Sequence, residues 1–114
     1  MDRPALNVRR GDMVRVVASG GCGKPRPAVV VQSDLFNDTH ASVTVCPVTS
    51  SFVEAPLFRV PLKPSKANGL ALNSQIMVDK IRTLRRDRIR ARVGAIGTVT
   101  MDNVEAALRL WLRL

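Results

Sequence analysis

Arg26 stands between two prolines, directly after the glycine-rich stretch 20–24 and directly before the apolar run 28–31. Proline fixes its own φ angle and biases the preceding residue toward extended backbone, so Pro27 holds Arg26 at the start of a strand. A guanidinium donates paired hydrogen bonds to a phosphate or a carboxylate. Arg26 is therefore a candidate anion-binding residue, and the alternative is a solvated arginine at the end of a loop.

Hydroxyl and carboxyl groups supply further candidates. Thr49, Ser50 and Ser51 follow one another at the end of an apolar segment, where they form either a hydroxyl-rich turn or donors to a ligand. Asp79 is an acid inside an apolar segment, shortly before Arg82. Its carboxylate could pair with an arginine such as Arg82 or act as a general base.

Histidine and cysteine offer weaker alternatives. His40 is the single histidine, a residue type that often transfers protons in enzymes, but it lies in a polar turn. A thiol nucleophile made of Cys22 and His40 has no separate oxyanion motif to support it. The spacing of Cys22, Cys46 and His40 matches no metal-binding motif, so we expect no metal, no cofactor and two reduced thiols.

The charge balance indicates a polyanionic partner. The chain has 18 Lys+Arg against 9 Asp+Glu, a formal net charge of +9. Nucleic acid is the leading candidate, ahead of an acidic protein and an anionic membrane surface. The densest basic stretch, 80–92, is mostly arginine, which suits phosphate binding. The residues expected to contact the nucleic acid are Lys24, Ser50, Ser51, Lys80, Arg82, Arg85 and Arg86.

The hydrophobic pattern predicts a mainly β protein. Strands are expected over 12–18, 27–32, 42–48, 58–62, 73–80 and 93–100, with a turn or single helical turn at 33–38 and a short helix within 80–92. Pro47 implies an edge, a bulge or a strand end. Apolar residues at three- and four-residue spacing from Met101 onward predict a C-terminal amphipathic helix, capped by Thr98 or Thr100, with Trp111 in the core.

These elements fit one small barrel with a C-terminal α-helix, spanning 1–114 as a single domain. No apolar run is long enough to span a bilayer, and the N-terminus opens on charge and proline. We therefore expect a soluble, cytoplasmic protein that does not act at a membrane. A homodimer is also expected, because small barrels with edge prolines often cover an edge with a second copy.

Taken in order, the motifs resemble the MazF/PemK family of toxin endoribonucleases. The motifs that carry the resemblance are Arg10-Gly11-Asp12, residues 26–31, Phe36-Asn37, residues 46–50, Gly69-Leu70, Asp79, residues 81–84 and the C-terminal helix. The resemblance implies an SH3-like barrel of the PemK/CcdB type, a homodimer, and metal-independent cleavage of single-stranded RNA, with mRNA the expected substrate. It also implies a cognate acidic antitoxin that occupies the RNA site.

The same resemblance assigns roles to three residues. Arg26 falls on the family's functional arginine and Thr49 on its functional hydroxyl, while Asp79 matches an acidic position proposed as catalytic in some members. Cleavage without a metal requires the ribose 2′-hydroxyl to attack the adjacent phosphate, leaving a 2′,3′-cyclic phosphate and a 5′-hydroxyl. Arg26 would stabilise the charge of that transition state, Thr49 would donate a hydrogen bond, and Asp79 would be the base.

Two other functions compete with the endoribonuclease. One is a non-enzymatic, CcdB-like small-barrel toxin that inhibits a protein target, and the other is a passive basic module that binds nucleic acid. The chain has 3 Phe, 1 Trp and no Tyr, too few stacking platforms for most single-strand binders. Arg26 together with Thr49 favours the enzyme.

Overall fold

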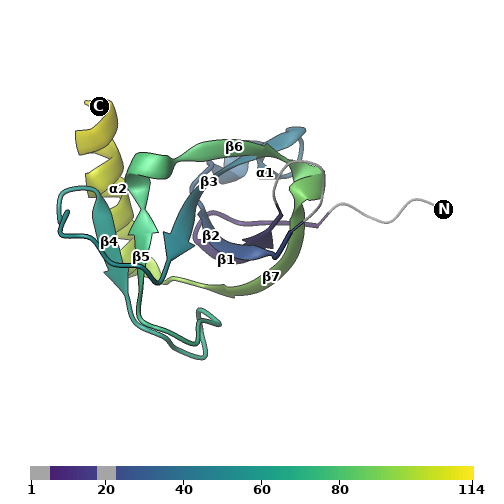
Figure 1. The fold of residues 1–114 in the computed structure, drawn as a ribbon. Coiled ribbons are helices and arrows are strands. Elements are labelled where there is room, and N and C mark those ends of the chain that lie inside the picture. Colours follow the sequence, from purple (N-terminus) through teal and green to yellow (C-terminus); the bar gives the residue numbers. More distant parts are fainter. Residues whose placement is uncertain (1–5, 18–22) are drawn as a thin grey trace.

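The computed structural model describes residues 6–17 and 23–114. Its strands form one strongly curved antiparallel sheet in the order β4-β5-β3-β2-β1-β7, with β6 paired to β3 (Figure 1). The strands are β1 (Asp12–Val16), β2 (Arg26–Val30), β3 (Ser42–Thr49), β4 (Arg59–Leu62), β5 (Ser74–Met77), β6 (Arg82–Arg85) and β7 (Ile89–Ala95). The helical elements are α1 (Asp34–Asn37), the 3-10 turns η2 (Val78–Lys80) and η3 (Arg86–Arg88), and the long C-terminal α2 (Thr98–Leu112).

The central strands are buried on both faces, which explains the unbroken apolar run 28–31. Successive side chains of a strand point to opposite faces. Val29 and Val31 join a core cluster under α2, the helix-side cluster, which also contains Met13, Cys46, Val48, Ile76, Met101, Val104 and Ala107. Ala28 and Val30 join the barrel-side cluster, together with Val8, Val14, Val43, Val45, Leu84 and Ile89. The mainly β barrel fold with a C-terminal helix is confirmed.

Pro47 lies inside β3, at the point where this strand changes one neighbour. β3 pairs with β2 through Cys46 and Pro47. On its other edge it pairs with β6 up to Val45 and with β5 from Val48. A proline has no N–H to donate, so it fits the interval between two partner strands. Pro47 therefore marks the point where β3 changes its partner strand, and not the sheet edge, bulge or strand end that the sequence suggested.

The basic segment 80–92 is not the expected short helix. β6 pairs with β3, η3 turns the chain, and β7 pairs with β1. Leu84 and Ile89 enter the barrel-side cluster while most of the charged side chains remain at the surface. Burying two large aliphatic side chains outweighs helix preferences of a few tenths of a kcal/mol per residue. The strand expected over 73–80 likewise ends at Met77, so Asp79 lies in η2.

The C-terminal helix is present, but its start and its tryptophan differ from expectation. Gly97 is the N-cap residue with φ 79°, a conformation that favours glycine, and no side chain caps the helix. Thr98 and Thr100 lie inside the first turn. Trp111 is 48% exposed and packs against Phe58 with 5.3 Å between ring centroids, so the expectation of a core tryptophan is wrong. No helix within residues 6–17 and 23–114 combines the length and apolarity needed to cross a membrane.

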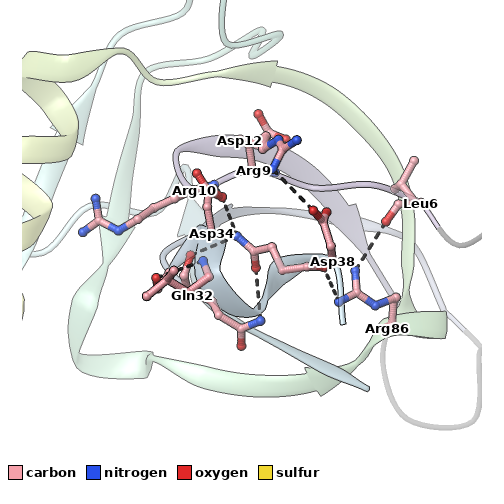
Figure 2. Close-up of polar contacts among 11 residues, drawn as sticks. Leu6, Arg9, Arg10, Asp12, Gln32, Asp34, Asp38 and Arg86 are labelled. Atoms are coloured by element: carbon pink, nitrogen blue, oxygen red, sulfur yellow. Dashed lines mark hydrogen bonds and ion pairs between the residues drawn. The ribbon is translucent and has the colours of Figure 1, made fainter. Parts of the chain in front are cut away.

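A polar network fixes α1 to the start of the sheet (Figure 2). The Asn37 side chain is fully buried; its amide donates to the Gln32 carbonyl at 3.0 Å and to Asp34 Oδ1 at 2.8 Å, and its Oδ1 accepts from Gln32 Nε2. The Arg10 backbone N–H also donates to Asp34 Oδ1, and these two hydrogen bonds lower the pKa of Asp34. The Arg86 guanidinium donates to the carbonyls of Leu6, Asn37 and His40.

We expect Asn37→Ala to lower the free energy of unfolding by about 2–3 kcal/mol, because it removes the three hydrogen bonds that the buried Asn37 side chain makes to Gln32 and Asp34. Chemical denaturation measures this. The matched control is Asp38→Ala, which removes only an exposed 3.8 Å ion pair to Arg9 and should cost less than about 0.5 kcal/mol. Equal losses for the two variants would contradict the importance of the network.

Candidate functional site

Strand register brings Arg26 and Thr49 together. Ala28 of β2 pairs with Pro47 of β3, and the same register continued by two residues places Arg26 opposite Thr49. Arg26 also pairs with Val16 of β1. Because side chains alternate along a strand, Arg26 lies on the same face as Ala28, and Thr49 on the same face as Pro47. That face belongs to the barrel-side cluster, so the two polar residues lie at the end of an apolar core.

Two hollows meet at this pair. The basic hollow, about 170 Å³, contains Lys24, Arg26, Arg82 and Thr49 against the aliphatic walls Val16, Val17, Val45, Val48 and Leu84, with Pro27, Pro47 and Met77. The serine hollow, about 270 Å³, has walls made of Ser50, Ser51, Leu70, Ala71, Leu72 and Ser74. Arg26 and Thr49 line both hollows, together with Pro27 and Val48. The pair therefore occupies the boundary between two differently lined recesses.

The cations of the basic hollow are available for a ligand. Among residues 6–17 and 23–114, the side chains of Lys24, Arg26 and Arg82 make no ion pair and no hydrogen bond. Other arginines of the basic segment are engaged: Arg85 pairs with Asp87 at 2.9 Å, and Arg92 pairs with Asp12 at 3.0 Å. Unpaired guanidinium groups beside a hydroxyl are suited to bind phosphate.

The Thr49 hydroxyl is oriented by its own turn. The Ser51 backbone N–H donates to Thr49 Oγ1 at 3.1 Å. Because this bond uses the oxygen as an acceptor, the hydroxyl proton is left to donate elsewhere. Ser50 and Ser51 are exposed and continue the lining of the serine hollow. The hydroxyl-rich turn that the sequence suggested is present, and it leaves the Thr49 hydroxyl proton free to donate to a ligand.

Asp79 is not brought together with Arg26 and Thr49. Its carboxylate forms a two-pronged ion pair with Arg59, at 2.8 Å from Nε to Oδ1 and 3.2 Å from Nη2 to Oδ2. The side chains of Arg59 and Asp79 are only 10% and 12% exposed. The partner is therefore Arg59 of β4, and Arg82 remains in the basic hollow. Burial, and secondarily the charge of Asp79, raise the pKa of the Cys46 thiol to about 12.

The remaining candidates are dispersed. Lys80 is exposed on η2 and lines neither hollow. Arg85 and Arg86 are engaged with Asp87 and with backbone carbonyls, respectively. His40 is exposed beyond α1, and Cys22 lies outside the described residues. Within the described part of the chain, no group of three or more His, Cys, Asp or Glu residues could hold a metal ion.

Sequence reasoning missed Arg59 and the far wall of the serine hollow. Arg59 is a charged residue in a short apolar strand, which is the same signal that drew attention to Asp79. Because the two charges are opposite, the sequence could have suggested an ion pair between them. Leu72 and Ser74 gave no functional signal, and Leu70 was noted only as part of the motif Gly69-Leu70. Their place in the wall of the hollow depends on the position of β5, of which Ser74 is the first residue.

A model of the family described as PemK-like, MazF-like toxin of type II toxin-antitoxin system matches residues 9–112. The chain belongs to this family. A probable endoribonuclease MazF of Mycolicibacterium smegmatis is 42% identical over 106 residues, which cover 92% of this chain and 96% of the relative. Endoribonuclease EndoA of Bacillus subtilis is 28% identical over 111 residues, or 94% of this chain and 96% of the relative.

The fold agrees with solved structures of the family. A mycobacterial endoribonuclease, solved in complex with its cognate antitoxin, matches with a TM-score of 0.79 at 24% identity, covering 94% of this chain and 96% of that one. The predicted MazF/PemK membership and the predicted enzyme class, an endoribonuclease, are confirmed.

We expect Asp79→Asn to lower the free energy of unfolding of this MazF-like toxin by about 3 kcal/mol, because it leaves the buried Arg59 guanidinium without its counter-charge. Denaturant titration measures the loss. Asp87→Asn, which removes an exposed partner of Arg85, is the matched control and should cost less than about 0.5 kcal/mol. A stability of Asp79→Asn close to that of the control would show that the ion pair contributes little.

Proposed function

We propose that this toxin is a metal-independent, sequence-selective endoribonuclease that cleaves single-stranded RNA to 2′,3′-cyclic phosphate and 5′-hydroxyl ends, with mRNA as the expected substrate. The observation that carries the proposal is the juxtaposition of Arg26 and Thr49 where the basic and serine hollows meet. A strand of RNA crossing this boundary would place a phosphate at the pair and its two neighbouring nucleotides in the hollows.

Arg26 acts on the phosphate. In-line attack by the 2′-hydroxyl builds negative charge on the phosphoryl oxygens, and the Arg26 guanidinium binds that charge more strongly in the transition state than in the ground state. Pro25, Pro27 and the pairing with Val16 hold the backbone of Arg26 in an extended conformation at the edge of the hollows before RNA arrives.

Thr49 donates its hydroxyl proton to a phosphate oxygen, since its oxygen already accepts from Ser51. Proton transfer needs other groups. Among the described residues that line the two hollows there is no carboxylate and no imidazole. We therefore assign proton transfer to Lys24, to water or to the phosphate itself, and we assign Asp79 to holding Arg59.

A cognate acidic antitoxin is proposed as the inhibitor. Carboxylates in the basic hollow would pair with Lys24, Arg26 and Arg82, the cations that the toxin leaves unpaired, and would exclude the RNA phosphate. The structural relative in complex with its own antitoxin supports this kind of partner. Loss of cleavage on addition of the antitoxin is the corresponding observation.

A second copy is proposed to cover an apolar face next to β4. This apolar face consists of Phe52, Val53, Leu57, Leu110 and Trp111, each 48–65% exposed. Hollows of about 340 and 280 Å³ lie within it, and both include Pro56, Arg59 and Pro61. β4 is the terminal strand of the sheet, and Pro61 blocks part of its free edge. Burial by side-chain packing against an identical face therefore suits this surface better than strand addition.

We expect Arg26→Ala to reduce the rate of RNA cleavage at least about 10³-fold and Thr49→Ala about 10²–10³-fold, because each removes a donor to the transition state. Asp79→Asn, assayed below its unfolding transition, should stay within a few fold of the wild type. The measurement uses a defined RNA in EDTA, with the 5′-hydroxyl ends sequenced.

Four outcomes would contradict the assignment. Cleavage that stops in EDTA would show that the reaction needs a metal ion. Near wild-type cutting by Arg26→Ala would show that Arg26 is not required for cleavage. RNA binding without any cutting by the wild type would indicate the passive module. A loss of 10²-fold or more in folded Asp79→Asn would instead restore Asp79 as the base.

We expect the double substitution Leu57→Asp, Leu110→Asp to convert a dimer into a monomer, because it buries charge at the centre of the apolar face. Sedimentation velocity measures the mass. Leu35→Asp is the matched control, since Leu35 is 83% exposed on α1, away from this face. A monomeric wild type, or a dimer that survives the double substitution, would overturn the proposed surface.

A further inference from the structure

We propose that Arg82 reads the base of one nucleotide next to the cleaved phosphate, and that the basic hollow selects a base with carbonyl acceptors, uracil or guanine, over cytosine or adenine. This inference rests on the proposed function of the Arg26–Thr49 pair. It assigns the two free guanidinium groups different tasks, phosphate binding for Arg26 and base recognition for Arg82.

The strand register separates the two arginines. Arg82 of β6 pairs with Val45 on one edge of β3, whereas Arg26 of β2 lies opposite Thr49 on the other edge. Val45 and Thr49 are four residues apart, roughly 13 Å along the strand, and β2 and β6 lie roughly 10 Å apart across it. The two side chains therefore reach the basic hollow from opposite edges of β3, an arrangement that suits contact with a phosphate from one edge and with the adjoining base from the other.

The walls of the basic hollow suit a base. The side chains of Val45, Pro47 and Thr49 all line it, as expected for alternate residues on one face of β3. Val16, Val17 and Leu84 complete an aliphatic lining that can contact the flat face of a base. A site for a second phosphate would need no such apolar surface, because a phosphate is charged and fully polar.

The polar side chains of the basic hollow are nearly all donors. Lys24, Arg26 and Arg82 only donate hydrogen bonds, and the Thr49 oxygen already accepts from Ser51. No carboxylate or amide side chain of the described residues lines this hollow. The amino group of cytosine or adenine would therefore face donors, whereas O4 of uracil or O6 and N7 of guanine would accept from them.

The serine hollow lacks this bias. The hydroxyls of Ser50, Ser51 and Ser74 can donate or accept, so they tolerate either kind of base edge. Selectivity should consequently be strict on one side of the cleaved bond and relaxed on the other. The experiment below tests the strict side.

The test measures the binding of two non-cleavable RNAs, 2′-O-methyl oligouridylate and 2′-O-methyl oligocytidylate, by fluorescence anisotropy. The 2′-O-methyl group removes the attacking hydroxyl, so the result is independent of cleavage. The two bases have the same size but present O4 and N4 respectively. We expect the wild type to bind the uridylate about 10-fold more tightly, and Arg82→Gln to bind both within about twofold of each other.

Thr83→Val is the matched control. Thr83 is the neighbour of Arg82 on β6 and makes a 2.8 Å hydrogen bond to Thr44, and it does not line the basic hollow. This variant should keep the wild-type preference for uridylate. Circular dichroism melting of each variant verifies the fold.

Two results would overturn the role of Arg82. Arg82→Gln could weaken binding to both RNAs equally and keep their ratio, which is the behaviour of a phosphate contact. Alternatively, the wild type could bind both equally or prefer cytidylate. Neither result bears on cleavage, which the EDTA assay of wild type and Arg26→Ala tests separately. Conversely, a wild type that fails to cut but retains the Arg82-dependent ratio would overturn the proposed enzyme and keep the base site.

Discussion

The register between β2 and β3 is the constraint on which the rest of this structure depends. It buries both faces of β2, with Val29 in the helix-side cluster and Ala28 in the barrel-side cluster. The same register sets Arg26 opposite Thr49. A slip of one residue would exchange the two faces and carry every core side chain to the wrong cluster. The geometry of the site is therefore protected by the packing energy of the whole core.

The strand β3 also explains why the site opens where it does. The edge of β3 that faces away from β2 pairs first with β6 and then with β5, and Pro47 lies in the interval between these two partners. The basic hollow forms beside that interval, over the end of the barrel-side cluster, and Arg82 enters it from the first residue of β6. A recess of this kind needs no separate binding domain, because it is the uncovered end of the barrel core.

The basic residues fall into two groups, those whose side chains pair with other groups of the protein and those that remain unpaired. Arg59, Arg86 and Arg92 hold elements together through a buried carboxylate, backbone carbonyls and Asp12, respectively. Lys24, Arg26 and Arg82 face a hollow without a counter-ion in the described part of the chain. The paired arginines thus stabilise the fold and the unpaired cations stay available for a ligand, and the density of arginines along the chain does not reveal which residue belongs to which group. An unpaired cluster of this kind repels itself until an anion binds, so it favours binding of a polyanion.

The sequence by itself determined the class of fold and the family, and it nominated Arg26 and Thr49 as the central candidate residues. Strand alternation, the apolar run 28–31 and the helical spacing after Met101 follow from local periodicity, and Arg26 between prolines is a local signal. The order of motifs led to the family, and Thr49 followed from it. Local pattern failed in the basic segment 80–92, where propensity favoured a helix and pairing with β1 and β3 imposed strands. It also failed for Trp111. The spacing of this residue matches the apolar face of the C-terminal helix, but its side chain is about half exposed in the fold.

Only the tertiary structure decided which charged groups face one another. Asp79 precedes Arg82 closely in the chain, yet its partner is Arg59, because β4 and η2 lie side by side while Arg82 begins a strand on β3. The composition of the two hollows likewise depends on residues from five or more separate segments. Ion pairs and recesses are formed between segments far apart in sequence, and electrostatic partners are chosen by distance in space, which periodicity along the chain does not encode.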